Sequence, residues 1–163
     1  MLIRKATEQD VPEVLEVFKY ARKFMAEHGN PTQWGDGYPP AEFIYGDIAN
    51  GTGYVFENDQ GEICGYFAFI IGEDKTYLKI YDGAWLNDEL YGTIHRIAGN
   101  GKGRGLLKAC VEYCSQFVPN LRIDTHNDNI VMQNDVAKNG FTKCGTIYVE
   151  DGTPRIAYQK IIE

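Results

Sequence analysis

A cluster of glycines between residues 99 and 105 stands immediately before a segment with helical periodicity. The glycines occupy the alternate positions 99, 101, 103 and 105, and the basic residues Lys102 and Arg104 lie between them. Glycine lets a backbone curl so that successive N–H groups point inward, and the N-terminus of a following helix adds partial positive charge. The two basic side chains would add full charges beside this loop. The cluster therefore predicts a loop that binds phosphate groups rather than a flexible turn.

Three classes of phosphate-containing ligand compete for this loop. A mononucleotide P-loop places Ser or Thr after its lysine to bind magnesium, but Gly103 follows Lys102. A dinucleotide-binding fold is partly matched, because Asp124 stands about 20 residues further on, where a ribose-binding acid belongs. The glycines of this chain, however, are spaced GxGxG, whereas the dinucleotide fingerprint is GxGxxG. In addition, His95 and Arg96 occupy a segment that should be apolar in a central parallel strand. A dinucleotide site remains the weaker alternative to the third class, coenzyme A.

Two histidines are candidates for proton transfer, because imidazole titrates near neutral pH. His95, on a predicted strand just before the glycine cluster, is the first choice for a catalytic base, and His126 is the second. A purely structural histidine is the alternative for each. No set of histidines and cysteines has the spacing of a metal site, so we predict no metal.

Composition narrows the class of protein and of partner. The chain has 163 residues, of which 44% are hydrophobic and 24% charged, as expected for one globular domain over residues 1–163. The net charge of −7 disfavours nucleic acid as a partner and favours a cationic amine. No signal peptide or membrane-spanning segment is evident, so we expect a cytoplasmic protein without membrane partners. Its four cysteines form no CxxC pair, which predicts buried free thiols: Cys64, Cys110, Cys114 and Cys144.

Hydrophobic periodicity and turn residues predict the elements that must position these groups. Helices are expected at residues 8–28, 40–50, 103–118 and 129–139. Strands are expected at residues 2–6, 54–57, 63–71, 91–98, 121–125, 141–150 and 155–162, with a further extended segment at 79–85. This order predicts an α/β (α+β) fold in which a mixed sheet carries helices on both faces.

The order of elements and several motifs resemble the GNAT superfamily of N-acetyltransferases over essentially the whole chain. The segment from Asn100 to Leu107 resembles the pyrophosphate-binding loop of that family, although Asn100 replaces the usual Arg or Gln. Residues 129–141, which end in Gly140 and Phe141, resemble the family's last helix and the strand that follows it. Residues 1–18 resemble its opening strand and helix.

The resemblance implies a twisted, mostly antiparallel sheet with about four helices, in which two parallel central strands splay apart. The strands at 91–98 and 121–125 match this pair, and the pantetheine arm of acetyl-CoA would insert between them. The implied cofactor-binding residues are Ile97, Ala98, Gly101, Lys102, Gly103, Arg104, Gly105 and Asn129. Many members use a tyrosine on the last helix to protonate the departing thiolate, but Val136 stands at that position. Tyr148, on the following strand, is the substitute that we consider.

The implied activity is transfer of an acetyl group from acetyl-CoA to a primary amine of a small molecule or peptide. The amine would attack directly within a ternary complex, in either a monomer or a homodimer. Four aromatic residues are candidates for the acceptor pocket: Trp34, Tyr38, Tyr45 and Trp85. Because Val136 removes the usual acid, a non-catalytic CoA-binding sensor remains the alternative function.

Overall fold

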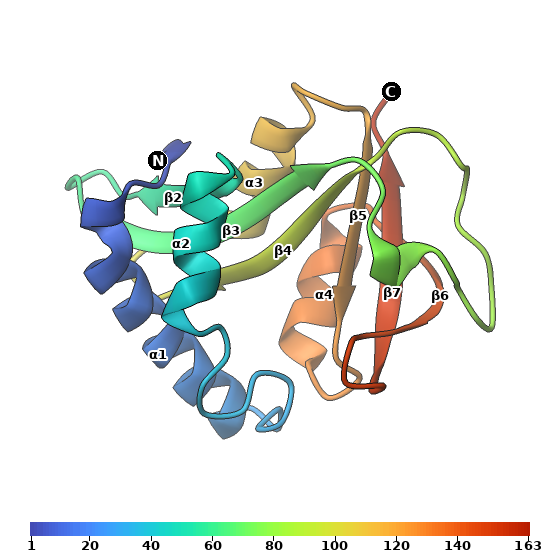
Figure 1. Ribbon diagram of the computed structural model, residues 1–163, viewed down its shortest axis with the longest axis horizontal. Coiled ribbons are helices and arrows are strands. Elements are labelled where there is room, and N and C mark those ends of the chain that lie inside the picture. The colour runs from blue at the N-terminus through green and yellow to red at the C-terminus, as the bar shows by residue number, and fades with distance from the viewer.

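The computed structural model describes residues 1–163 and contains one seven-stranded sheet with the spatial order β1-β2-β3-β4-β5-β7-β6 (Figure 1). Neighbouring strands are antiparallel except for the central pair β4 and β5, which is parallel. The strands are β1 (Leu2–Lys5), β2 (Gly53–Glu57), β3 (Ile63–Ile71), β4 (Gly92–Gly99), β5 (Asn120–Thr125), β6 (Thr142–Tyr148) and β7 (Pro154–Ile161). The mixed, mostly antiparallel sheet agrees with the fold class that the sequence predicts.

Four α-helices cover the two faces of this sheet. They are α1 (Val11–Glu27), α2 (Ala41–Ala49), α3 (Leu106–Cys114) and α4 (Ile130–Lys138). Helices α1 and α2 share one hydrophobic core with β2, β3 and the end of β4, whereas α3 and α4 share another on the opposite face. The apolar stripe of each helix faces the sheet, because burying it is the main source of stability for short helices.

Several predicted elements differ from the structure in kind or in their bounds. Residues 8–10 form a short 3₁₀ helix, η1, before α1, and α3 ends at Cys114 rather than residue 118. Residues 79–85 form no strand; a short 3₁₀ helix, η2 (Lys75–Tyr77), is followed by an irregular loop with one isolated bridge between Tyr81 and Thr146. Helix α3 begins at Leu106 rather than residue 103, because Gly105 lies in the left-handed region with φ of 67°. All four cysteines are free and buried, as predicted.

The parallel strands β4 and β5 pair over two positions only. Gly92 is in register with Leu121, and Thr93 with Arg122; beyond them the strands separate. In Figure 1 the two strands meet near the top of the view and diverge downward. The notable property of this sheet is therefore an opening between its two central strands, as the resemblance implies.

A β-bulge lies in β4 where the opening begins to widen. Tyr66 pairs with Ala98 and Ala68 with His95, so Arg96 and Ile97 together oppose a single residue of β3. Arg96 has φ of 55°, a left-handed conformation that is uncommon for a residue with a side chain. Such bulges leave backbone groups unpaired and redirect side chains.

The side chain of Arg96 stabilises this bulge through a buried polar network. Its guanidinium donates to both carboxylate oxygens of Asp47 on α2, at 2.7 and 3.2 Å, and to the hydroxyl of Tyr38 at 3.2 Å. The hydroxyl of Tyr66 donates to the same carboxylate at 2.6 Å. Only 14% of the Arg96 side chain and 7% of the Asp47 side chain are exposed. The network therefore fixes α2 and the bulge to one another.

None of the helices combines the length and the hydropathy that crossing a bilayer requires. No group of three or more His, Cys, Asp or Glu side chains is arranged to hold a metal ion.

Replacing Asp47 by Ala leaves the Arg96 guanidinium buried without its carboxylate. We expect Asp47→Ala to lower the free energy of unfolding by about 3 kcal/mol, measured by urea denaturation. The matched control is Glu27→Ala, which removes an exposed ion pair with Lys23 and should change stability by less than about 0.5 kcal/mol. Equal effects of the two substitutions would contradict the role of the buried pair.

Candidate functional site

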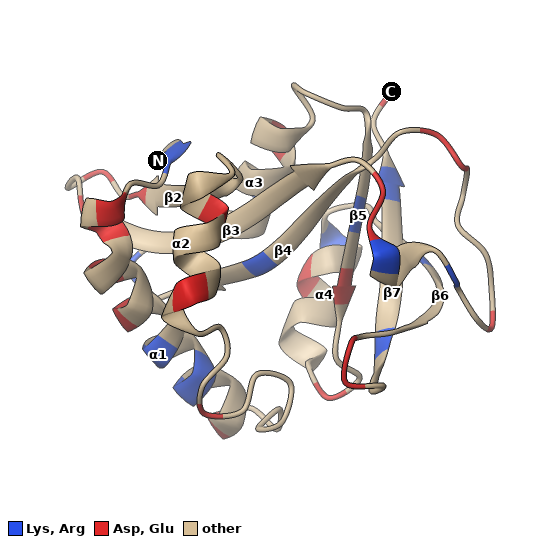
Figure 2. Cartoon of the chain, in the orientation of Figure 1, with Lys and Arg blue, Asp and Glu red and all other residues tan.

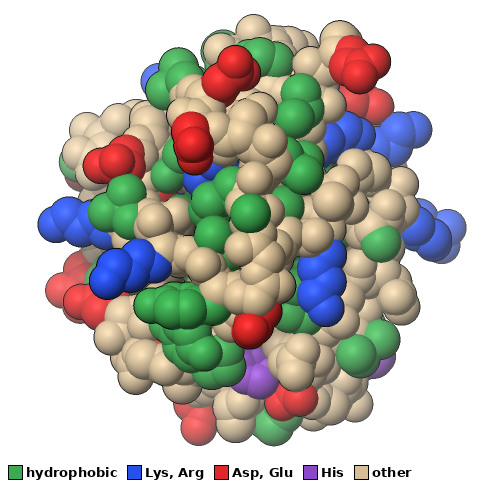
Figure 3. Space-filling model, turned by 90° about the vertical axis from the view of Figure 1, so that its right-hand side faces the viewer, with side chains coloured by type: hydrophobic (Ala, Val, Ile, Leu, Met, Phe, Trp, Pro, Cys, Tyr) green, Lys and Arg blue, Asp and Glu red, His purple; other side chains and the backbone are tan.

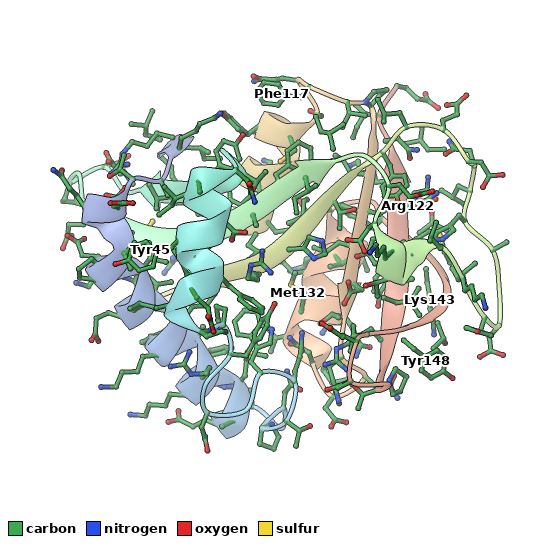
Figure 4. All side chains as sticks on the ribbon, viewed as in Figure 1. Tyr45, Phe117, Arg122, Met132, Lys143 and Tyr148 are labelled. Atoms are coloured by element: carbon green, nitrogen blue, oxygen red, sulfur yellow. The ribbon has the colours of Figure 1, made fainter.

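A cleft of about 1010 Å³ occupies the opening between β4 and β5. Its walls come from α1, the loop after α1, β4, the glycine loop, β5, α4 and the start of β7. Met132, on α4, lies beside this opening (Figure 4). Acidic positions on β5 and α4 stand next to it in Figure 2 and belong to Asp124 and Asp135, which both line the cleft. One continuous cavity thus reaches from the glycine loop to the end of β5.

The glycine loop borders this cleft and carries unpaired backbone N–H groups. The amides of Gly101, Gly103 and Arg104 donate to no acceptor within the protein, and α3 begins after Gly105 without a side-chain cap. Gly101 and Gly105 have φ of 81° and 67°, so the curled backbone depends on glycine at both positions. The three glycines at 101, 103 and 105 line the cleft. This arrangement can bind a phosphate group through backbone amides and the helix N-terminus.

His95 lines the cleft one residue before the bulge, and Asp74 holds its ring. The Nε2 atom of His95 lies 2.8 Å from Oδ2 of Asp74, which precedes η2. Because a carboxylate accepts hydrogen bonds, Nε2 carries the proton and Nδ1, which has no partner within the protein, can accept another. Burial raises the pKa of Asp74, but hydrogen bonds from His95 and Thr76 outweigh it and hold that pKa below its usual value. The pair has the geometry of an oriented general base.

A second polar pair, Tyr77 and Asp124, lies beside this histidine. The hydroxyl of Tyr77 donates to Oδ2 of Asp124 at 2.6 Å, and the Tyr77 ring centroid lies 6.3 Å from that of His95. Burial raises the pKa of Asp124 above its usual value, although the Tyr77 hydrogen bond lowers it. Asp124 lines the cleft at the C-terminal end of β5. It therefore places a hydrogen-bonded carboxyl group close to His95.

Aromatic side chains form the wall of the cleft opposite β5. Trp34 packs edge-on against Phe18 at 5.6 Å and lies 6.0 Å from Tyr38, which contacts Phe43 at 5.8 Å. Trp34, Tyr38 and Phe43 line the cleft. The predicted acceptor residues Trp34 and Tyr38 are thus brought together.

Asn129 lines the cleft at its wide end, where it caps α4. Its Oδ1 accepts from the amide of Met132 at 3.1 Å, and its Nδ2 donates to the side chain of Gln33 at 3.1 Å. Arg155 of β7 donates to the carbonyl oxygen of Gln33 at 3.4 Å. The loop after α1 thereby bridges the opening from one arm of the sheet to the other.

Ile97, Ala98 and the three loop glycines, which the resemblance implies as cofactor-binding residues, lie on the cleft. Lys102 and Arg104 are exposed residues of the same loop and do not line the cleft, and Lys102 pairs with Glu62 at 3.5 Å. The structure thus brings the backbone of the predicted phosphate loop to the cleft, but not its two basic side chains.

Three other predicted residues lie away from the cleft. Tyr148 ends the edge strand β6, where 47% of it is exposed and its ring packs against Tyr81 (Figure 4). It is far from β5 in the sheet because β7 returns between β5 and β6. Tyr45 is exposed on the outer side of α2, and Trp85 packs against Arg122 and donates to the carbonyl of Tyr77. We expected Tyr148, Tyr45 and Trp85 to line the reaction site, but the structure places all three outside the cleft.

Sequence reasoning missed Asp74 and Tyr77, and it considered Asp124 as the ribose-binding acid of a dinucleotide site. Asp124 carried a usable signal, since an acid at the C-terminal end of a parallel strand next to a glycine loop points toward a ligand cleft. His126 accepts from the amide of Asp128 and does not line the cleft.

Comparison with solved structures gives a full-length match. An acetyltransferase of the GNAT family from Streptococcus agalactiae is 36% identical, with a TM-score of 0.89, over 99% of this chain and 95% of that one. The chain belongs to the GNAT family of N-acetyltransferases. A GNAT acetyltransferase from Listeria monocytogenes matches at 21% identity and a TM-score of 0.72, over 99% of this chain and 94% of that one. No family model and no curated protein matches the chain.

A more distant GNAT structure shares the fold. The phosphinothricin acetyltransferase from Sinorhizobium meliloti, solved in complex with AcCoA, is 13% identical with a TM-score of 0.64, over 99% of this chain and 88% of that one. At this level of identity the likeness concerns the fold alone.

The hydrogen bonds to Asp74 make stability depend on pH. Because the folded pKa of Asp74 lies below its unfolded value, its contribution is fully present above the unfolded pKa of about 4 and is lost as the pH falls through the folded value. We expect the difference in melting temperature between the wild type and Asp74→Asn to be largest near neutral pH and to shrink below about pH 4. Asp36→Asn, at an exposed carboxylate without hydrogen bonds, is the control. A difference that stays constant down to about pH 3 would contradict the assignment.

Proposed function

We propose that this protein transfers an acetyl group from acetyl-CoA to a primary amine of a small molecule or peptide. The observation that carries the proposal is the opening between β4 and β5, which runs directly to the unpaired amides of the glycine loop. A diphosphate bound by Gly101, Gly103 and Gly105 would place the attached pantetheine arm along the free edge of β4. The site thus fits an extended thioester with a phosphate anchor at one end.

The free edge of β4 also supplies groups for the arm and for the reacting carbonyl. An extended chain lying against this edge can exchange backbone hydrogen bonds with β4 in place of β5. The bulge at Arg96 and Ile97 turns the backbone at the level of His95. An N–H group of Ile97 or Ala98 would there stabilise the negative charge that develops on the thioester oxygen.

His95 is the group that we assign to proton transfer. Its free Nδ1 removes a proton from the attacking amine while Asp74 holds the ring and stabilises the imidazolium. The nitrogen–carbon bond forms, the carbon–sulfur bond breaks, and the thiolate takes the proton back from the imidazolium. One residue can serve as both base and acid, which matters because Val136, at the position of the family's usual acid, is fully buried.

The remaining walls suit a cationic acceptor with an apolar body. Asp124 offers a carboxyl group that can accept a hydrogen bond from an amine beside His95, and Trp34 and Tyr38 offer flat apolar surface on the other side. The net charge of −7 would favour the approach of a cation over the whole molecule.

Gly105 offers a test of the phosphate site that avoids steric effects. A Cβ atom at this position meets nothing within 4 Å, and Asp and Asn both tolerate its left-handed conformation better than other residues. We expect Gly105→Asp to bind CoA about 10-fold more weakly than Gly105→Asn, since a nearby carboxylate repels the diphosphate. Isothermal titration calorimetry with CoA measures both affinities. Equal affinities for the two variants would exclude this loop as the diphosphate site.

Replacing His95 tests the chemistry separately from binding. We expect His95→Gln to lower kcat/KM by about 100-fold, while the Kd for CoA stays unchanged. Release of the CoA thiol with a panel of primary amines gives the rate. His28→Gln, at an exposed histidine that ends α1, is the control and should keep full activity. Full activity of His95→Gln would rule out the assigned base, and absence of thiol release with every amine would contradict the proposed reaction.

A further inference from the structure

A second cavity, of about 320 Å³, lies on the other side of Tyr77 from the cleft. It is formed mainly by the loop between β3 and β4, and Arg122 of β5 forms its inner wall. The lining includes the aromatic residues Tyr77, Trp85 and Tyr91 and the acidic residues Glu73, Asp88 and Glu89. Its size lies at the lower end of the range for ligand pockets, which suits a small metabolite.

Arg122 is the unusual feature of this cavity. Its guanidinium carbon lies 4.0 Å from the ring centroid of Trp85 and 3.9 Å from that of Tyr91, so the group is held between two rings. Nη2 donates to the carbonyl oxygen of Asn87 at 2.8 Å, but Nε is buried without any partner. The residue is 3% exposed and makes no ion pair.

Arg122 differs from the other buried or half-buried arginines of this protein, because one of its buried nitrogens has no partner of any kind. Arg155 is also buried without a carboxylate, but it donates to the hydroxyl of Thr153 and to the carbonyl oxygens of Pro154 and Gln33. Arg4 pairs with Asp10 and Glu57, and Arg96 pairs with Asp47. A buried guanidinium without a carboxylate is unfavourable, because the aromatic rings replace only part of the lost hydration. Burial correspondingly lowers the pKa of Arg122. The missing counter-charge indicates that an anionic group from outside the chain completes the environment of Arg122.

The rim of the cavity carries the opposite charge. Glu73, Asp88 and Glu89 are exposed, and none of their carboxylates forms an ion pair with a basic side chain. Figure 3 views the face that carries this loop, and acidic and hydrophobic side chains lie next to one another on it. An acidic rim repels a phosphate dianion or a dicarboxylate, whereas it attracts an ammonium group.

We propose that this cavity binds a free α-amino acid, whose carboxylate contacts Arg122, whose ammonium group faces the acidic rim, and whose side chain packs on the aromatic walls. A simple amine would leave Arg122 without an anion, and a simple carboxylate would face three uncompensated acids. The proposal concerns a site distinct from the acceptor region of the cleft and does not depend on the proposed acetyl transfer.

The cavity is linked to the candidate catalytic pair through its walls. The hydroxyl of Tyr91, whose ring stacks on Arg122, accepts from the amide of Asp74, and the hydroxyl of Tyr77 donates to Asp124. Arg122 is also in register with Thr93, at the last position where β4 and β5 pair. An amino acid at Arg122 therefore lies where the two central strands begin to separate.

Trp85 provides a probe inside this cavity, because the chain has only two tryptophans. In the Trp34→Phe background, fluorescence reports Trp85 alone. The common amino acids other than tryptophan are titrated at millimolar concentrations, and at least one should give a saturable change in emission. The same titration is repeated with the decarboxylated amine and the deaminated acid of the best amino acid, which should each bind at least about 10-fold more weakly, since each lacks one charge.

Two sets of variants locate the response. Arg122→Gln should abolish it, while Lys143→Gln, an exposed basic residue on the same half of the sheet, should leave it unchanged (Figure 4). The combined variant Glu73→Gln, Asp88→Asn and Glu89→Gln changes only exposed side chains, so it keeps the fold even if Arg122→Gln does not. It should weaken binding of the amino acid but not of its deaminated analogue.

Three outcomes would overturn the proposal. The first is no saturable response to any amino acid. The second is a response that survives in folded Arg122→Gln, which would place the amino acid elsewhere, for example in the acceptor region of the cleft. The third is an unchanged affinity for the amino acid in the combined acidic variant.

Discussion

The partial pairing of β4 and β5 is the constraint on which the rest of this structure depends. Two adjacent parallel strands normally satisfy each other's backbone groups along their length, but here they do so at two positions only. The separated edges carry backbone groups that need partners, because unpaired buried amides and carbonyls are costly. A ligand that can lie between the strands as an extended chain meets that need. The cleft, the glycine loop at its end and the histidine on its edge all follow from this one separation.

Holding two arms of a sheet apart requires connections outside the sheet. The Arg96–Asp47 pair fastens the bulge of β4 to α2, and it does so with charged groups that are buried and mutually satisfied. Near the narrow end of the opening, Asp74 and Tyr77 connect one short segment to His95 on β4 and to Asp124 on β5. The residues that we assign to catalysis are thus placed by the same contacts that fix the separation.

The fold and the position of the glycine loop before α3 could be predicted from the sequence because both rest on local signals. Alternating glycines before an apolar helix can be recognised without knowledge of the tertiary structure, and the four helices were predicted from hydrophobic periodicity. The polar partners of His95 could not be found in this way, since Asp74 and Tyr77 lie in a short 3₁₀ segment without hydrophobic period. Tyr148 and Trp85 were assigned wrongly for a related reason. Alternation along a strand does not reveal which strand lies at the edge, and an aromatic residue in a loop gives no indication of the cavity that it faces.

Gln33 has a consequence for how firmly the two ends of the opening are held. At the wide end of the opening, its side chain and carbonyl join the loop after α1 to Asn129 and Arg155. These are single hydrogen bonds without a paired carboxylate, each contributing on the order of 1 kcal/mol. Breaking these hydrogen bonds leaves every strand pair of the sheet intact. The wide end of the opening is therefore held by weaker contacts than the region beside His95, where Asp74 and Tyr77 bond to groups on both strands.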